Sequence, residues 1–185
     1  MPYLFKQFAK PTPAPVPPAV VEAICFQISK ELYSQYLYNS MGACFQAKGL
    51  PGMARWMYKQ AREEQEHAFK FMEWLTTKGQ KVNLLPIPAP EVQWWDSPVE
   101  VFKQSLHHEE YVTSLIHELG EKILPFDKEH PGLKMPELIK WFEEEQVEEE
   151  KSVADVIGMF EAVEKKEKTL EQLDGEIALL RQEKC

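Results

Sequence analysis

Residues 53–71, MARWMYKQAREEQEHAFKF, form the most informative stretch of this chain. Its apolar residues recur at steps of three and four, which is the spacing of one face of an α-helix. Glu64 and His67 interrupt that face near its middle. A buried carboxylate is very unfavourable unless a positive group lies beside it, so this face predicts a cation between helices. The complete stripe is Met53, Met57, Gln60, Glu64, His67 and Phe71.

Three further stretches show a helical stripe interrupted by glutamate. Glu31, Glu109 and Glu149 each lie near the middle of a predicted helix. Chance often places one glutamate on an apolar stripe, but it rarely does so on four. Several carboxylates and one imidazole that converge inside a helical bundle suit a pair of iron or manganese ions. The three stripes are Ile24, Ile28, Glu31, Gln35 and Tyr38; Phe102, Leu106, Glu109, Thr113 and Ile116; and Leu138, Phe142, Glu145, Glu149, Val153, Val156 and Phe160.

The composition of this 185-residue chain favours one all-α domain with a sizeable core, because only 8 residues are glycine and 44% are hydrophobic. The net charge of −9 disfavours nucleic acid as a partner, since its phosphates would be repelled. The same charge suits cations, although it is equally explained by solubility. No apolar run approaches the roughly 18 residues of a membrane span, so no membrane contact is expected.

The cysteines indicate a reducing compartment. Cys25, Cys44 and Cys185 are scattered, and the chain has no CxxC pair that would suggest a zinc ribbon or a rubredoxin-type iron site. An odd number of widely spaced cysteines is typical of reduced thiols. We therefore expect a cytoplasmic location, with a plastid as the alternative, and we expect Cys25 and Cys44 to pack as small core residues.

Proline and glycine divide the chain into a proline-rich N-terminal extension, residues 1–18, and a helical domain, residues 19–185. The extension cannot be helical, and a passive tail is favoured over a segment that binds a partner. The connection over residues 80–97 is long enough to cross the whole bundle, so that the helices on either side of it run parallel. The expected helices span residues 18–47, 51–78, 98 to about 124, 133–164 with a bend near Gly158, and 168–181.

Two local patterns strengthen the prediction of a metal site. Glu64 and His67 are three residues apart, so both side chains project from the same side of a helix and can hold one cation. Residues 143–150 contain six acids within eight positions, which cover nearly every direction around a helix. Some of these acids must point inward, and a bound cation would relieve their mutual repulsion.

Four segments resemble the ferroxidase motifs of non-haem ferritins: ELYSQYLY at 31–38, EEQEHA at 63–68, HE at 108–109 and WFEEEQVEEE at 141–150. The resemblance covers roughly residues 20–182 and is closer to the prokaryotic and algal members than to animal catalytic chains. It implies a ferritin-like four-helix bundle with one long crossover and a short fifth helix. It also implies a hollow cage of about two dozen copies that stores ferric mineral.

The resemblance assigns two iron positions to the buried acids. By matching position, Glu31, Glu64 and His67 would hold the first iron. Glu64 would also bridge to a second iron, with Glu109 and Glu149 completing its ligands. Anionic oxygen ligands stabilise ferric over ferrous iron, so the implied activity is that of a ferroxidase. Its partners would be ferrous iron and dioxygen, with a diferric species and peroxide as the products.

The resemblance also assigns roles around these two positions. Gln146 would lie beside the pair as a weak ligand or a hydrogen-bonding group. Tyr38 would act next to the cluster as an electron or hydrogen-bond donor, and Trp141 matches an aromatic position near the centre. A third iron site, as in bacterial-type members, would be formed by Glu63, Glu145, Glu148 and Glu149.

Two alternatives differ in their chemistry. A di-iron redox enzyme or a haem-bearing bacterioferritin typically has a second Glu-x-x-His step, where this chain has Gln146 and Glu149. The bacterioferritin methionine that binds haem is matched by Gln65, so no haem is expected. A metal-free helical scaffold is the other alternative, and it predicts no oxygen uptake with ferrous iron.

Overall fold

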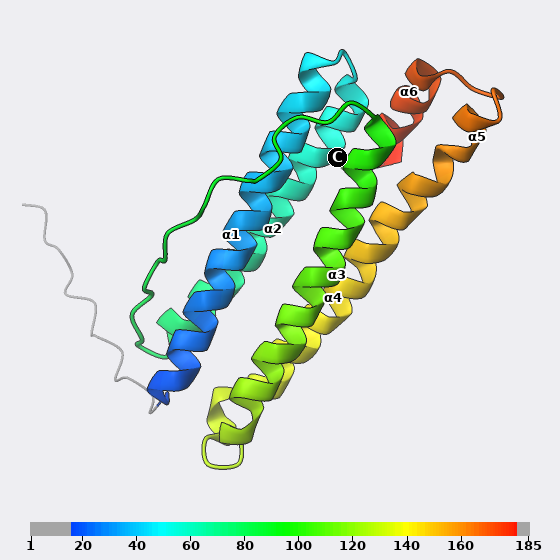
Figure 1. Ribbon diagram of the computed structural model, residues 1–185. Coiled ribbons are helices and arrows are strands. Elements are labelled where there is room, and N and C mark those ends of the chain that lie inside the picture. Colours follow the sequence, from blue (N-terminus) through cyan, green and yellow to red (C-terminus); the bar gives the residue numbers. More distant parts are fainter. Residues whose placement is uncertain (1–15, 181–185) are drawn as a thin grey trace, which may run out of the picture.

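The computed structural model describes residues 16–180, which form a bundle of four long helices with short helical segments before and after the fourth (Figure 1). Residues 1–15 and 181–185 lie outside the described part, so the prediction for the N-terminal extension falls almost entirely there, as does Cys185. The elements are α1 (Pro18–Ala47), α2 (Pro51–Thr77), α3 (Pro98–Ile123), η1 (Leu124–Phe126), η2 (Pro131–Leu133), α4 (Met135–Met159), α5 (Glu161–Glu164) and α6 (Leu170–Leu180).

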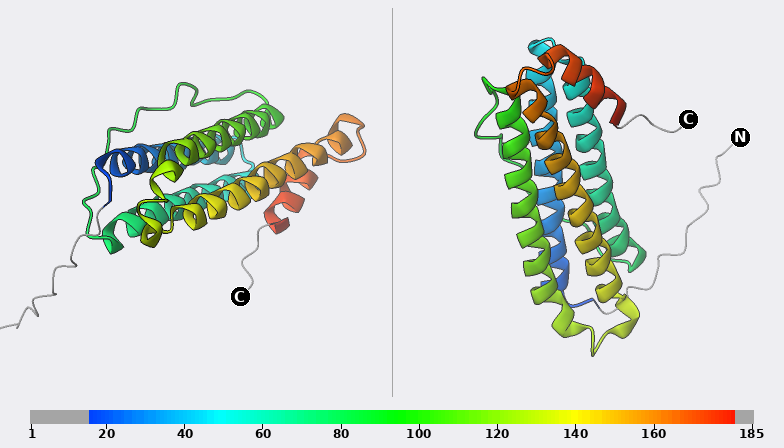
Figure 2. Two further views of the ribbon diagram at one scale, coloured as in Figure 1. Left: turned by 90° about the horizontal axis from the view of Figure 1, so that it is seen from below. Right: turned by 90° about the vertical axis from the view of Figure 1, so that its right-hand side faces the viewer.

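The connections set the directions of the helices. A tight turn joins α1 to α2, so these two helices pack antiparallel along their length. The crossover, residues 78–97, runs along the bundle from the end of α2 to its opposite end, and α3 therefore runs parallel to α2 (Figures 1 and 2). Helix α4 returns antiparallel to α3, and α6 packs against α2. The predicted all-α bundle with one long crossover is confirmed.

Proline and glycine fix the helix boundaries that the sequence predicted. Helices α1, α2 and α3 each have proline in the first turn, where a missing N–H costs no hydrogen bond. Gly49 and Gly79 follow the ends of α1 and α2 with φ of 73° and 71°. Side chains disfavour this left-handed conformation, so glycine there ends each helix sharply.

The fourth helix is shorter than predicted at both ends. Pro131–Leu133 form a separate 3₁₀ turn, and Lys134 has a left-handed φ of 58°, so α4 begins only at Met135. At the other end, the amide N–H of Phe160 bonds to the carbonyl of Ile157, and α4 ends at Met159 before the one-turn helix α5. The bend expected near Gly158 is therefore a break just after it.

The described core consists of two apolar clusters with a polar layer between them. One cluster packs Ile24 and Ile28 of α1 with Phe71, Ile116 and Phe142. The other is centred on Met41, Phe45, Met57, Phe102 and Val153. Burial of each side chain of this size stabilises the fold by roughly 1.5–3 kcal/mol, so the two clusters offset the unfavourable burial of a polar layer. Glu31, Glu64, Glu109 and Glu149 occupy that layer, one from each long helix.

The predicted stripes needed two corrections next to this layer. In α1 the buried position is that of Ser34, and Gln35 is only half-buried. In α4 Gln146 is buried, whereas the Glu145 side chain is 29% exposed. Steps of three and four fit a helix equally well. The buried residue in the structure lies four positions after Phe142, whereas the stripe predicted a step of three.

The two internal cysteines pack as predicted. Cys25 and Cys44 are buried and free, and both lie in the apolar clusters. In the described part of the chain, no helix is long and apolar enough to cross a membrane.

Candidate metal centre

The polar layer places five acid or imidazole side chains in the bundle interior. Glu31, Glu64 and Glu109 are at most 1% exposed, and His67 and Glu149 are 4% exposed. Ligand atoms of Glu31, Glu64 and His67 all lie within 4.8 Å of one another, and so do those of His67, Glu145 and Glu149. Within α2, Nδ1 of His67 lies 3.5 Å from Oε2 of Glu64. The structure thus brings together residues from four helices as the sequence predicted.

Three acids of the layer hold protons more tightly than ordinary carboxyls. Burial raises the pKa of Glu31 to about 7 and that of Glu109 to about 8. The pKa of Glu64 is raised well above its usual range, first by burial and then by the charges of Glu109, Glu31 and Glu149. Glu64 therefore lies close enough to the other three carboxylates for their charges to act on it.

The imidazole of His67 is suited to ligation. Burial lowers its pKa, and this effect outweighs the opposite influence of the surrounding carboxylates. A neutral imidazole has a free lone pair with which to bind a metal ion. The ring is held edge-on by Trp141 and Phe142, with centroid separations of 5.8 and 5.9 Å.

Buried atoms without hydrogen-bond partners identify where a cation fits. Oε2 of Glu31, Oε1 of Glu64 and Nδ1 of His67 are buried and accept or donate no hydrogen bond within residues 16–180. In the same part of the chain, no lysine or arginine forms an ion pair with Glu31, Glu64 or Glu109. Native interiors rarely leave such groups unsatisfied, and oxygen with imidazole nitrogen is a donor set that iron accepts.

Neutral side chains hold the acids in place. The amide of Gln27 donates to Oε1 of Glu31 at 2.9 Å, and the hydroxyl of Tyr38 donates to Oε1 of Glu109. The amide of Gln146 donates to the backbone carbonyl of Glu109 at 3.2 Å, and Gln60 donates to Glu149.

Two of these supporting groups were not assigned a role from the sequence. Gln27 stands four residues before Glu31, and this i, i+4 spacing is the signal that would have found it. Gln60 was placed on its stripe, but its partner Glu149 lies 89 positions away. A contact across such a sequence separation has no local pattern.

The predicted third site is only partly assembled. Glu145 lies near the centre, with Oε1 3.8 Å from Nε2 of His67. Glu63 and Glu148 belong to neither of the two ligand groups, and Glu148 is exposed. Glu63 and Glu145 line a cleft of about 410 Å³ between α2 and α4, and His67 lies at the same cleft. The third site stays a prediction.

Known proteins resemble this chain along most of its length. A family model described as a ferritin-like domain matches residues 21–163. The bacterial non-heme ferritin of Bacteroides fragilis (strain 638R) is 33% identical over 141 residues, which cover 73% of this chain and 82% of that protein. The bacterial non-heme ferritin of Escherichia coli O157:H7 is 27% identical over 163 residues, covering 88% of this chain and 96% of that protein.

A solved structure agrees with the family model and with these relatives. The open pore ferritin of the hyperthermophilic archaeon Archaeoglobus fulgidus is 35% identical, with a TM-score of 0.80, and the match covers 90% of this chain and 99% of that one. Sequence, fold and the buried acids of the four helices lead to the same family. This chain belongs to the ferritin family.

Proposed function

We propose that this ferritin oxidises ferrous iron with dioxygen at the buried layer and stores the ferric product inside a shell of its own copies. Iron is the substrate and cargo of the reaction. Two ferrous ions each lose one electron, and dioxygen takes up both electrons with two protons to give hydrogen peroxide. As a family member with these features, the chain is an iron-storage protein.

One observation carries the proposal: buried acids from four helices meet, and within residues 16–180 no lysine or arginine forms an ion pair with Glu31, Glu64 or Glu109. Burial of several carboxylates is strongly unfavourable when nothing neutralises them. Two divalent cations would neutralise the layer and satisfy its orphaned oxygen atoms. Carboxylate oxygens also stabilise the higher charge of ferric iron, so binding favours the oxidised product.

The residues fall into two groups around Glu64. Glu31 and His67 lie within ligand distance of one side of Glu64, and the charges of Glu109 and Glu149 act on it as well. A first iron would therefore be held by Glu31, Glu64 and His67. A second would be held by Glu64, Glu109 and Glu149, with Glu64 as the bridge.

Tyr38 and Gln146 would hold the ligands of the second iron in place. Tyr38 donates a hydrogen bond to Oε1 of the Glu109 carboxylate, and the Gln146 amide donates to Oε2 at 3.4 Å, so they fix the rotamer of that carboxylate before a metal arrives. The Tyr38 hydroxyl is buried, and the pKa of this phenol is raised well above its usual range by burial and then by Glu109. Tyr38 therefore stays protonated and is able to donate a hydrogen bond or an electron beside the iron pair.

His67 would connect the iron pair with the cleft between α2 and α4. Its ring lies between Glu64 on one side and Glu145 on the other. Glu145 with Glu149 and His67 forms the second ligand group, which supports a further cation position on the path outward. We assign this position, with Glu63 and Glu148 at its edge, to iron that leaves the centre.

Assembly and location complete the proposal. The crossover exposes Leu84, Ile87 and Trp94, the last with 57% of its surface accessible, and apolar side chains of this kind favour contact with another subunit. We assign a shell of about two dozen subunits and a cytoplasmic location.

Rapid mixing of metal-free protein with ferrous salt in aerated buffer tests the activity. We expect oxygen uptake much faster than in buffer alone, at one dioxygen per two ferrous ions in the first turnover. Prior loading with Zn²⁺, which accepts the same carboxylate and imidazole ligands, should suppress it. If ferrous iron is oxidised no faster with the protein than in buffer alone, the proposal is wrong and the metal-free scaffold is the better explanation.

A further inference from the structure

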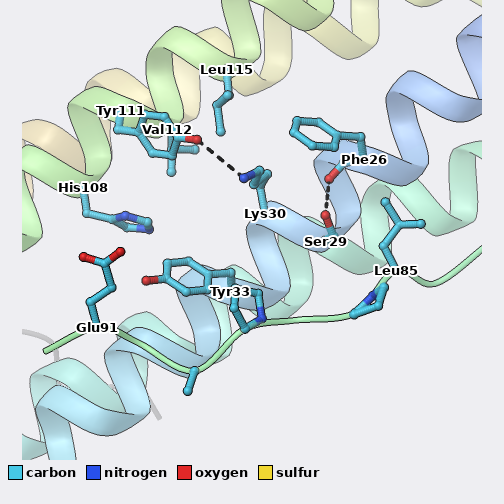
Figure 3. A pocket seen from close by; sticks show the side chains of 13 residues that line it. Phe26, Ser29, Lys30, Tyr33, Leu85, Glu91, His108, Tyr111, Val112 and Leu115 are labelled. Carbon is cyan, nitrogen blue, oxygen red and sulfur yellow. Dashed lines mark hydrogen bonds between the residues drawn. The ribbon is translucent and has the colours of Figure 1, made fainter. Parts of the chain in front are cut away.

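A cavity separate from the metal centre lies between α1, α3 and the crossover (Figure 3). Its volume of about 530 Å³ is within the range of small-molecule sites in proteins. Phe26, Tyr33 and Tyr111 provide aromatic walls, and Val112 and Leu115 provide aliphatic ones. Such walls favour a ligand with a flat, apolar body.

One end of the cavity carries a positive charge without a carboxylate partner. Nζ of Lys30 lies 3.5 Å from the hydroxyl of Tyr111 and 4.9 Å from the ring centroid of Phe26. In the described part of the chain, Lys30 forms no ion pair. An ammonium held against two aromatic rings, with no acid beside it, attracts an anionic group.

The other end of the cavity presents hydrogen-bond acceptors. The Ser34 hydroxyl donates to the carbonyl of Lys30 at 3.1 Å, so its oxygen accepts from Nε2 of His108 at 2.8 Å. The other ring nitrogen of His108, Nδ1, has no hydrogen bond within residues 16–180. The carboxylate of Glu91 points toward His108 and Tyr33 in Figure 3.

We propose that this cavity binds a small aromatic carboxylate with a hydrogen-bond donor at its far end. Its carboxylate would pair with Lys30, its ring would lie between Phe26, Tyr33 and Tyr111, and its donor would meet Glu91 and His108. A metal ion fits less well, because neither group of converging ligand atoms in the described chain includes Glu91 or His108.

Calorimetric titration of the assembled, iron-free protein with 4-hydroxyphenylacetate tests the site. We expect one site per subunit. Lys30→Met, which keeps the length of the side chain, should weaken binding about tenfold or more, as expected for loss of a charge-assisted hydrogen bond. Lys103→Met is the matched control, since Lys103 is an exposed lysine of α3 that pairs with Glu100 at 2.9 Å.

Two further measurements assign each end of the ligand. Wild-type protein should bind the uncharged 4-hydroxyphenylacetamide about tenfold more weakly, and Lys30→Met should bind the acid and the amide alike. Glu91→Gln should weaken the binding of 4-hydroxyphenylacetate. It should not change the binding of phenylacetate, which lacks the hydrogen-bond donor. Absence of binding at millimolar ligand, or equal binding by wild type and Lys30→Met, would overturn the proposal. Because no iron is used, the result is independent of ferrous oxidation.

Discussion

Nδ1 of His67 lies 3.5 Å from Oε2 of Glu64, one helical turn away on α2, and this nitrogen forms no hydrogen bond within the described residues. Two ligand atoms this close, both buried, define the edge of a position that a cation fits. Orphaned oxygen atoms of Glu31 and Glu64 belong to residues of the same ligand group.

Replacement of the bridging acid should abolish rapid oxidation. We expect Glu64→Ala to slow ferrous oxidation at least tenfold, because both proposed iron positions lose a ligand. Stopped-flow absorbance of the ferric product measures this rate. Glu66→Ala, an exposed acid on the same helix, is the control and should keep the wild-type rate. Undiminished oxidation in Glu64→Ala would contradict the assignment of Glu64.

The same substitution should stabilise the metal-free protein. Glu64 is 1% exposed and has an orphaned oxygen, so its removal relieves an unfavourable burial. Thermal unfolding of metal-free Glu64→Ala should therefore occur at a higher temperature than that of wild type. A lower midpoint would mean that Glu64 has a structural partner of its own.

Tyr38 should affect the reaction but not the binding of iron. Tyr38→Phe removes only the hydroxyl that donates to Glu109. We expect anaerobic ferrous titration to give the wild-type stoichiometry, while the rate of oxidation falls several-fold. Loss of a bound iron in Tyr38→Phe would show that the hydroxyl is a ligand.

The metal-free protein should lose stability as the pH rises. Burial raises the pKa of Glu31 to about 7 and that of Glu109 to about 8, above the ordinary value of 4.5. The folded state then binds more protons than the unfolded state between pH 4.5 and 8, so the free energy of unfolding falls with pH across this window. Glu109→Gln should reduce that slope, and bound Zn²⁺ should reduce it in wild type. Equal slopes in Glu109→Gln and wild type would refute this origin.

Helix α6 should stabilise the start of α2. The carboxylate of Asp174 accepts hydrogen bonds from the amides of Gly52 at 2.9 Å and Met53 at 2.7 Å. These are amides that a helix N-terminus leaves without partners, so Asp174→Ala should lower the free energy of unfolding by about 1–2 kcal/mol. Asp155→Ala, which removes an exposed ion pair with Lys151, is the control and should leave the unfolding temperature close to that of wild type. Equal shifts of the unfolding temperature in Asp174→Ala and Asp155→Ala would rule out the capping role of Asp174.

The sequence was sufficient for the helices and for the polar layer because both depend on local rules. Proline in the first turn and glycine after the last residue predicted the bounds of α1, Pro18–Ala47. One glutamate on each stripe predicted which residues converge. The boundary of α4 was missed because Pro131–Leu133 form their own turn, and no residue type marks the left-handed Lys134.

Contacts between distant residues could not be predicted. The choice between Glu145 and Gln146 as the buried residue depends on the rotation of α4 against α3, where Gln146 meets Glu109. The cavity beside Lys30 is formed in part by the crossover. The path of this segment over the bundle could not be predicted, because its sequence has no periodic pattern. These features arise from packing and are absent from any single segment.

Anomalous diffraction at the iron edge, from crystals soaked in ferrous salt without oxygen, tests the central claim most directly. We predict two iron peaks in the bundle interior, one beside Glu31, Glu64 and His67 and the other beside Glu64, Glu109 and Glu149. An interior without iron, with these carboxylates turned toward solvent, would contradict the account.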